Sequence, residues 1–189
     1  MFILASQSPR RKELLAQVLG DIPFKAVPSA FNERAICVKD VRKLCLLEAQ
    51  GKGEVVSKEY PDDIVISADT MVSYQGEQLG KPKDHEDAMR MLRELSGNTH
   101  EIVTAYSIRK GEKELLHRVV IAKLFLEKMS DSEIEAYLDT GSPYDKAGGY
   151  GVQDTDFINS RILEGTKSTI MGLPVEDLEE DLVSLGLLK

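Results

Sequence analysis

Residues 4–15 read Leu-Ala-Ser-Gln-Ser-Pro-Arg-Arg-Lys-Glu-Leu-Leu, a stretch that predicts a strand followed directly by a helix. The apolar run 1–5 ends at turn-forming residues, as a short buried strand does. Ser8 can cap the helix with its hydroxyl, and Pro9 suits the first helical position because its missing N–H is not needed there. Apolar residues then recur at helical spacing, namely Leu14, Leu15, Val18 and Leu19.

Two arginines, Arg10 and Arg11, fall in the first turn of this predicted helix. Cations at a helix N-terminus oppose the macrodipole, so they do not stabilise the helix. A bound anion would explain them if it were held by free backbone N–H groups, by the Ser6 and Ser8 hydroxyls and by the two guanidinium groups. On spacing alone, this anion site and a solvated arginine pair on a surface helix are equally well supported.

The composition suits a folded protein of modest size. The 189 residues fit one domain or two small lobes, and a hydrophobic content of 42% is enough for a core. The formal net charge is −8 and the acidic residues are scattered, which argues against a general nucleic-acid binding protein. A small phosphate ligand is compatible with this charge, because a local basic cluster is enough to hold it.

Targeting and redox signals point to the cytoplasm. No stretch approaches the length of a membrane-spanning helix, and no basic region precedes the apolar start, so we expect neither a membrane partner nor a signal peptide. Cys37 and Cys45 fit no redox or zinc motif, and we expect both to be small core residues in a reducing compartment. The histidines lack metal-ligand spacing, and we expect surface or capping positions for His85, His100 and His117.

Strand and helix patterns alternate irregularly along the chain, which predicts an α/β or α+β sheet covered by helices. Helical patterns cover residues 40–56, 85–96, 130–141 and 174–185. Strand patterns cover residues 24–27, 64–73, 102–109, 115–128, 161–163 and 168–171. We expect Asp84 to cap one helix, and Ser130 with Glu133 to form a capping box at another.

Asp69 and Thr70 interrupt the apolar strand pattern of residues 64–73. A carboxylate there needs a reason, because burial of an unpaired charge is costly. One interpretation is a metal ligand or general base at a strand end that faces a cleft. The other is a capped strand end whose carboxylate is paired with a lysine.

Three further segments carry candidate binding groups. Gly80-Lys81-Pro82 presents a lysine on a tight turn, which suits a phosphate oxygen, although this is not a P-loop. Residues 145–153 contain Lys146, three glycines and Gln153, whose amide can match the edge of a nucleobase. In isolation this segment is more typical of an ordinary glycine-rich turn than of a ligand site. Glu33 is a second carboxylate that could complete a divalent cation site.

Taken together, these segments resemble the Maf family of nucleoside triphosphate pyrophosphatases. They occur in order over nearly the whole chain, and the ordered set is far more specific than any one motif. The segments are Leu-Ala-Ser-Gln-Ser-Pro-Arg-Arg (4–11), Ser-Ala-Asp-Thr-Met-Val (67–72), Gly-Lys-Pro (80–82), Met-Leu-Arg-Glu-Leu-Ser-Gly-Asn-Thr-His (91–100), Asp-Lys-Ala-Gly-Gly-Tyr-Gly-Val-Gln (145–153) and Gly-Leu-Pro (172–174).

The resemblance implies a Maf/ITPase-like α/β fold. It predicts a single domain over residues 1–189, with an elongated mixed sheet flanked by helices and two lobes around a central cleft, often as a homodimer. It also implies hydrolysis of a nucleoside triphosphate between the α and β phosphates, with a divalent metal cofactor, Mg²⁺ or Mn²⁺.

The resemblance also assigns roles by position. Asp69 matches the proton acceptor, and Arg11 and Lys81 match phosphate-contacting catalytic positions. Glu33 matches a carboxylate of the same cleft and would hold the metal together with Asp69. The expected substrate-binding residues are Ser6, Ser8, Arg10, Thr70, Lys146 and Gln153.

Three positions separate two branches of the family. Arg10, Thr70 and Gln153 resemble the branch that acts on dTTP and UTP, whereas Trp, Gln and Glu at these places are typical of the branch that acts on 7-methyl-GTP. A glutamine amide can pair with both the N3–H and a carbonyl of uracil or thymine, whereas a glutamate can only accept hydrogen bonds.

The sequence departs from the family pattern at several positions. Glu48-Ala49 stands where the family usually carries Lys-Ala, and Lys52 lies one turn later as a candidate substitute. The remaining departures are Asp154, Asp156, Lys167 and Thr169. Two other functions therefore stay open, a non-catalytic nucleotide sensor that regulates septum formation and a pyrophosphatase for 7-methyl-GTP or a damaged purine. An RNA-binding module is disfavoured by the acidic charge and the few aromatic residues.

Overall fold

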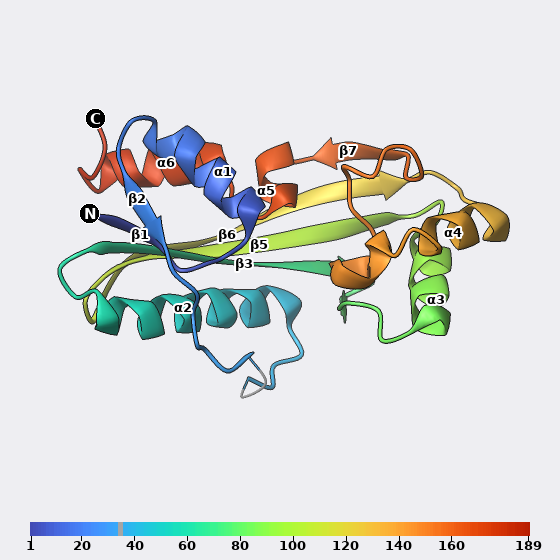
Figure 1. Cartoon of the computed structure of the whole chain (residues 1–189), viewed down its shortest axis with the longest axis horizontal. Coiled ribbons are helices and arrows are strands. Elements are labelled where there is room, and N and C mark those ends of the chain that lie inside the picture. The colour runs from blue at the N-terminus through green and yellow to red at the C-terminus, as the bar shows by residue number, and fades with distance from the viewer. Residues whose placement is uncertain (34–35) are drawn as a thin grey trace. The chain divides into compact units, whose positions relative to one another are not determined.

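The computed structural model describes residues 1–33 and 36–189, in which seven strands form one mixed sheet flanked by helices (Figure 1). The strands are β1 Phe2–Leu4, β2 Phe24–Ala26, β3 Ile64–Tyr74, β4 Glu77–Leu79, β5 Thr99–Lys110, β6 Lys113–Leu126 and β7 Ser160–Glu164. The α-helices are α1 Pro9–Leu19, α2 Val41–Glu59, α3 His85–Leu95, α4 Asp131–Leu138, α5 Lys167–Met171 and α6 Val175–Ser184. Two 3-10 turns, η2 Ser142–Asp145 and η3 Ala147–Gly149, lie between α4 and β7.

The sheet order is β2-β1-β3-β5-β6-β7, and β4 pairs with β3. β1 runs parallel to both β2 and β3, whereas β3 with β4 and β6 with β7 are antiparallel. The prediction of a mixed sheet flanked by helices is therefore confirmed, and the predicted strands 102–109 and 115–128 correspond to the neighbouring strands β5 and β6.

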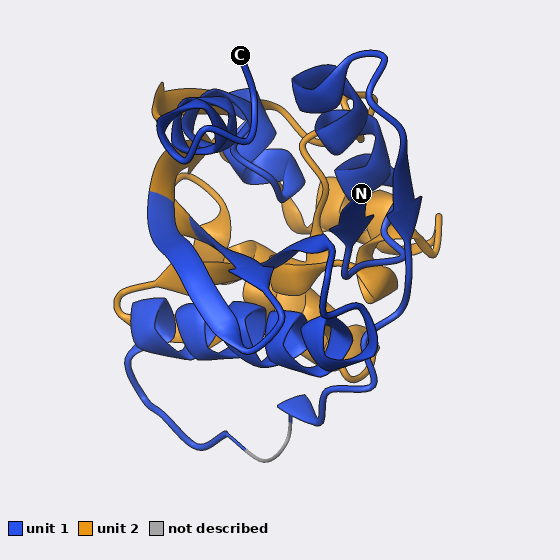
Figure 2. Ribbon diagram, turned by 90° about the vertical axis from the view of Figure 1, so that its left-hand side faces the viewer, with its two compact units in different colours: residues 1–70, 103–120, 166–189 blue, residues 71–102, 121–165 orange. Residues whose placement is uncertain are grey.

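The chain divides into two compact units (Figure 2). Unit 1 comprises residues 1–70, 103–120 and 166–189, and unit 2 comprises residues 71–102 and 121–165. The long strands β3, β5 and β6 each begin in one unit and end in the other. The expected two-lobed domain with a central cleft stays a prediction.

In unit 1, helices cover both faces of the sheet. Phe2 and Leu4 of β1 belong to the cluster made with α1 and α6, whereas Ile3 and Ala5 pack with Val56 of α2. This alternation follows from the period of two in a strand. A full side-chain burial of this kind stabilises the fold by roughly 1.5–3 kcal/mol per large apolar residue.

The caps that were predicted from the sequence are confirmed. Ser8 Oγ accepts a hydrogen bond from the N–H of Arg11, and Pro9 is the first residue of α1. Asp84 caps α3, and Ser130 with Glu133 forms the capping box of α4. Local hydrogen bonds of this type satisfy the N–H groups that a helix start leaves free.

The expected strand over 168–171 is wrong, because this segment forms the helix α5. Thr166 Oγ1 accepts from the N–H of Thr169 and starts the helix, and Gly172 ends it with a φ of 111°. Pro174 precedes α6 as its N-cap rather than as its first residue. Asp69 does not stand at a strand end either, since β3 continues to Tyr74.

Two expectations about burial are also wrong. Cys45 is buried as expected, but Cys37 is exposed and lies before α2. His85 and His117 are exposed, whereas His100 is only 2% exposed and its Nε2 pairs with the hydroxyl of Tyr150. Burial lowers the pKa of His100 from 6.5 to about 4.

Because the neutral imidazole is favoured in the folded state, His100 should make the protein less stable in acid. In the unfolded chain the imidazole takes up a proton as the pH falls below 6.5, and in the folded protein only near pH 4. The difference in unfolding free energy between the wild type and His100→Gln should therefore fall by about 3 kcal/mol between pH 7 and pH 4. Urea denaturation across this range measures it, and His85→Gln is the exposed control; a difference that is independent of pH would contradict the assignment.

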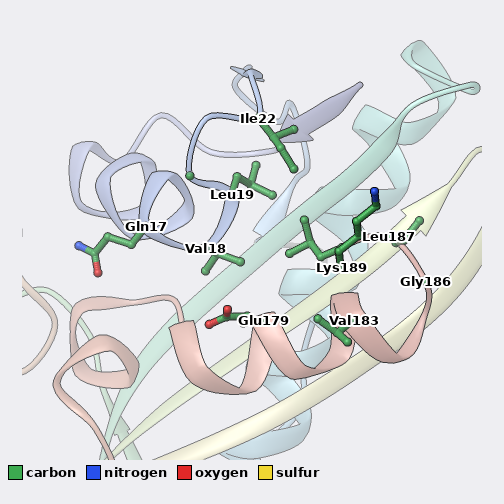
Figure 3. A pocket seen from close by; sticks show the side chains of 11 residues that line it. Gln17, Val18, Leu19, Ile22, Glu179, Val183, Gly186, Leu187 and Lys189 are labelled. Carbon is green, nitrogen blue, oxygen red and sulfur yellow. The ribbon is translucent and has the colours of Figure 1, made fainter.

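Unit 1 also carries a surface groove of about 540 Å³ between α1 and α6 (Figure 3). It is lined by Gln17, Val18 and Leu19 of α1, by Glu179 and Val183 of α6, and by Gly20, Ile22, Gly186, Leu187, Leu188 and Lys189. None of the site residues predicted from the sequence belongs to this lining.

Candidate functional site

Three carboxylates gather in unit 1. Glu33, Glu48 of α2 and Asp69 of β3 each place an oxygen within 4.8 Å of the others. Asp69 and Glu48 are buried, and Glu33 is exposed. Oxygen ligands at this spacing suit a hard divalent cation such as Mg²⁺ or Mn²⁺.

Small residues on α2 allow these side chains to meet. A Cβ on Gly53 would lie 2.6 Å from Ser67 Oγ, so only glycine lets α2 pack this closely against β3. A Cβ on Gly51 would overlap the ring of Phe31 at 2.3 Å, so glycine admits the segment that leads to Glu33. Ser67 Oγ then donates to the carbonyl of Ala49 at 2.6 Å and fixes the helix on the strand.

Lys52 lies among the carboxylates. Its Nζ is 2.6 Å from Asp69 Oδ1 and 2.7 Å from Glu33 Oε1, and its side chain is 14% exposed. Burial opposes the charge of this lysine, but Asp69 and Glu33 outweigh burial and raise the pKa of Lys52. Of the alternative interpretation of Asp69, a capped strand end paired with a lysine, the ion pair is therefore present but the strand end is not, and the lysine lies one turn after Glu48.

The cluster carries more negative than positive charge, and this excess contributes to a raised pKa of Glu48. Burial, followed by the charges of Asp69 and Glu33, raises the pKa of Glu48 to about 7. Three carboxylates face one ammonium group, so an additional cation would relieve the repulsion among them.

Arg11 is held rigidly in the same unit. Its Nε donates to the carbonyl of Gly172 at 2.9 Å, and its Nη2 donates to Thr70 Oγ1 at 3.1 Å. Thr104 Oγ1 lies 3.1 Å from Thr70 Oγ1 and 2.8 Å from the carbonyl of Thr169, to which it donates. Burial lowers the pKa of Arg11, whereas the charge of Asp69 opposes this effect.

Gly172 makes this arrangement possible. Its φ of 111° favours glycine, and a Cβ there would lie 3.2 Å from Thr70 Oγ1 and 3.3 Å from Arg11 Nε. The turn after α5 therefore fixes the guanidinium group against β3 at Thr70, the residue beside Asp69.

The serines before α1 act as caps. Ser6 Oγ accepts from the N–H of Ser8 at 3.2 Å, and Ser8 Oγ accepts from the N–H of Arg11 at 3.4 Å. The N–H groups of Ser8 and Arg11 thus already have partners, which differs from the expectation of free donors. Arg10 is exposed at the surface of unit 1.

In unit 2, two predicted segments lie together. The carbonyl of Gly80 accepts from the N–H of Gly148 at 3.0 Å, and a Cβ on Gly149 would lie 3.3 Å from the ring of Pro82. The loop that carries Lys81 therefore packs against the glycine-rich turn that leads to Gln153. Lys81 and Gln153 are exposed, and Lys146 is half-buried.

The structure thus brings Arg11, Glu33, Asp69 and Thr70 into one neighbourhood of unit 1, and Lys81, Lys146 and Gln153 into unit 2. That both groups serve one groove stays a prediction. The sequence interpretation missed Glu48 and Thr104 as site residues. Thr104 carried a signal, since it interrupts an apolar strand as Asp69 and Thr70 do.

Known proteins with similar sequences cover nearly the whole chain. The family model described as "Maf-like protein" matches residues 1–185. A dTTP/UTP pyrophosphatase from Lacticaseibacillus casei (strain BL23) is 37% identical, over 97% of this chain and 98% of its own. A dTTP/UTP pyrophosphatase from Pyrococcus furiosus is 42% identical, over 92% of this chain and 89% of its own.

Among solved structures, a HAM1 protein from Coxiella burnetii matches with a TM-score of 0.48 and 11% identity, over 97% of this chain and 98% of that chain. Within residues 1–33 and 36–189, no helix has both the length and the apolar character that a membrane crossing requires.

Proposed function

Because the chain belongs to the Maf family, we propose that it hydrolyses dTTP and UTP to the nucleoside monophosphate and pyrophosphate. The observation that best supports this reaction is the position of Asp69 in β3. Its carboxylate lies with two others and beside Thr70, which holds the guanidinium group of Arg11. A base, a candidate cation site and an anion-binding group therefore occur together in unit 1.

The residues present fit a divalent cation, since their three oxygens lie within 4.8 Å and carry excess negative charge. Glu33, Glu48 and Asp69 would hold Mg²⁺ or Mn²⁺, and Lys52 would have to move away from Asp69. When bound, such an ion supplies positive charge to phosphate oxygens and acidifies a water molecule.

The side chains of the protein would then divide the work. Asp69 accepts a proton from the water whose oxygen attacks the α phosphorus, and the bond from the α phosphorus to the bridging oxygen breaks. Arg11 and Lys81 stabilise the charge that grows on the leaving pyrophosphate. Ser6, Ser8, Arg10 and Lys146 contact the substrate, as the resemblance implies.

Gln153 would recognise the base. Its amide donates to one carbonyl of uracil or thymine and accepts from N3–H, which a carboxylate cannot do.

We also propose that the two units are lobes of one domain and that the enzyme works in the reducing cytoplasm, where the free thiols of Cys37 and Cys45 persist.

A nucleotide panel tests the function directly. Purified protein with Mn²⁺ should release pyrophosphate from UTP and dTTP at least tenfold faster than from 7-methyl-GTP or ITP. Binding of UTP without release of pyrophosphate would instead support the second candidate function, a nucleotide sensor. The observation that favours this second candidate is the position of the Lys52 ammonium group between Asp69 and Glu33. Faster release of pyrophosphate from 7-methyl-GTP than from UTP would instead assign the chain to the branch that acts on 7-methyl-GTP.

Glu48→Gln tests the third carboxylate. The variant keeps the size of the side chain but removes one anionic oxygen. The concentration of Mn²⁺ that gives half-maximal activity should therefore rise about 10- to 100-fold, the loss of metal affinity that is typical when a residue around a metal site is replaced. At saturating Mn²⁺ most of the activity should return. Glu54→Gln, on an exposed position of the same helix, is the matched control, and an unchanged Mn²⁺ requirement of Glu48→Gln would remove Glu48 from the cation site.

A further inference from the structure

The turn that carries Gln153 is tied at both ends to one side chain. The hydroxyl of Tyr137 in α4 donates to Asp154 Oδ2 at 2.5 Å, and the hydroxyl oxygen of Tyr137 accepts from the N–H of Gly151 at 3.2 Å. The N–H of Asp154 closes the turn on the carbonyl of Gly151 at 3.0 Å. Gln153 lies between these two anchors.

Asp154 is also held from the other side. Ser142 Oγ donates to the same carboxylate oxygen at 2.9 Å. Lys146 Nζ donates to the carbonyl and the hydroxyl of Ser142, and it lies 3.7 Å from Asp154 Oδ2. Burial, followed by the neighbouring carboxylate of Asp154, raises the pKa of Tyr137, so its hydroxyl keeps the proton that it donates.

The Gln153 amide itself lies close to this network. A Cβ on Gly151 would be 2.8 Å from Gln153 Nε2 and 2.9 Å from Lys146 Cε, so the amide and the lysine chain both lie over the glycine backbone. Tyr150, before Gly151, is fixed by its hydrogen bond to His100. The backbone beneath an exposed amide is thus immobilised on several sides.

The orientation of this amide decides the selectivity between pyrimidines. Uracil offers an N3–H donor beside a carbonyl, whereas cytosine offers an N3 acceptor beside an amino group. A glutamine amide matches uracil in one orientation and cytosine after a half-turn, because its oxygen and nitrogen exchange places. Discrimination therefore requires that the orientation be held.

We propose that Tyr137 and Asp154 are positioning residues that hold the Gln153 turn in the orientation that selects uracil and thymine over cytosine. This role rests on the proposed function, in which Gln153 recognises the base. It also gives Asp154, a departure from the family pattern, a purpose in this chain. The carboxylate gathers Tyr137, Ser142 and Lys146 around the turn.

Tyr137→Phe tests the proposal. The variant keeps the ring that stacks on Phe157 at 5.6 Å but loses both hydrogen bonds of the hydroxyl. For UTP, KM should rise about tenfold with kcat within about twofold, as expected when one or two hydrogen bonds are lost. The ratio of kcat/KM for UTP to that for CTP should fall about tenfold, because the freed amide accepts both bases.

The control is Tyr144→Phe, which removes a hydroxyl from η2 of the same unit that makes no hydrogen bond within the described part of the chain. A second series compares Asp154→Asn, which keeps an acceptor for Tyr137, with Asp154→Ala, which does not. The asparagine variant should retain more of the selectivity for UTP, and equal loss in both would contradict the proposal.

The outcomes distinguish a failure of the proposed function from a failure of the positioning role. If the wild type releases no pyrophosphate from UTP, or does not prefer UTP to CTP, the proposed function or its base recognition is wrong. If the wild type is selective and Tyr137→Phe keeps this selectivity, the positioning role alone is wrong. A Tyr137→Phe variant with a lower melting temperature and equal losses for UTP and CTP shows a merely structural role and overturns the proposal.

Discussion

Replacement of Asp69 by asparagine should lower kcat for UTP hydrolysis by about 1,000-fold, in the range reported for loss of a general base. The amide has nearly the same shape as the carboxylate but cannot accept the proton of the attacking water. The substitution also removes one negative charge from the candidate cation site and turns the ion pair with Lys52 into a neutral hydrogen bond at most. Pyrophosphate release with and without saturating Mn²⁺ measures the effect.

The fold should survive this change. Lys52 keeps Glu33 as a partner at 2.7 Å, and Ser67 still ties α2 to β3. The melting temperature of Asp69→Asn should therefore stay within a few degrees of the wild type. Asp131→Asn, at an exposed pair with Arg93, is the control that should leave kcat unchanged. Near-normal turnover in Asp69→Asn would remove Asp69 from the chemistry.

Replacement of Arg11 by alanine should lower kcat/KM by about 100-fold or more, as loss of a preorganised charge-stabilising group does. Hydrogen bonds to Gly172 and Thr70 hold the guanidinium group before substrate arrives, so little reorganisation is needed when charge grows on the leaving group. Arg11→Lys keeps the charge without the planar fork, and we expect an intermediate activity.

The control for Arg11 is Arg90→Ala on the exposed surface of α3, where the side chain pairs with Asp87 and Glu94. Steady-state kinetics with UTP and a melting curve should be measured for each variant. If Arg11→Ala loses stability but keeps kcat/KM among the molecules that remain folded, Arg11 has a structural role only.

Features with local causes were predictable from the sequence. Ser8 with Pro9, and Ser130 with Glu133, lie within one turn of the helices that they start, so their hydrogen bonds need no knowledge of the rest of the chain. The nearly continuous apolar run of β3 likewise reflects burial on both faces of the strand. The prediction for residues 168–171 was wrong because the β-branched residues there suggest a strand, whereas Thr166 and Gly172 set the ends of a helix.

The composition of the acidic cluster was not predictable in this way. Glu33, Glu48 and Asp69 meet only because Gly51 and Gly53 let α2 approach Phe31 and β3. This is a tertiary effect that no short pattern contains. Glu48 replaces a lysine of the family pattern, and Lys52, the candidate substitute from the sequence, does reach Asp69 from one turn further along the same helix. His100 was misplaced for the same reason, since its burial comes from packing near Tyr150.

The most direct test of the account follows UTP hydrolysis by ³¹P nuclear magnetic resonance in water enriched in ¹⁸O. We predict that UMP and pyrophosphate are the only products and that the label enters UMP, because water attacks the α phosphorus. Formation of UDP and orthophosphate, or label in the pyrophosphate, would contradict the proposed reaction.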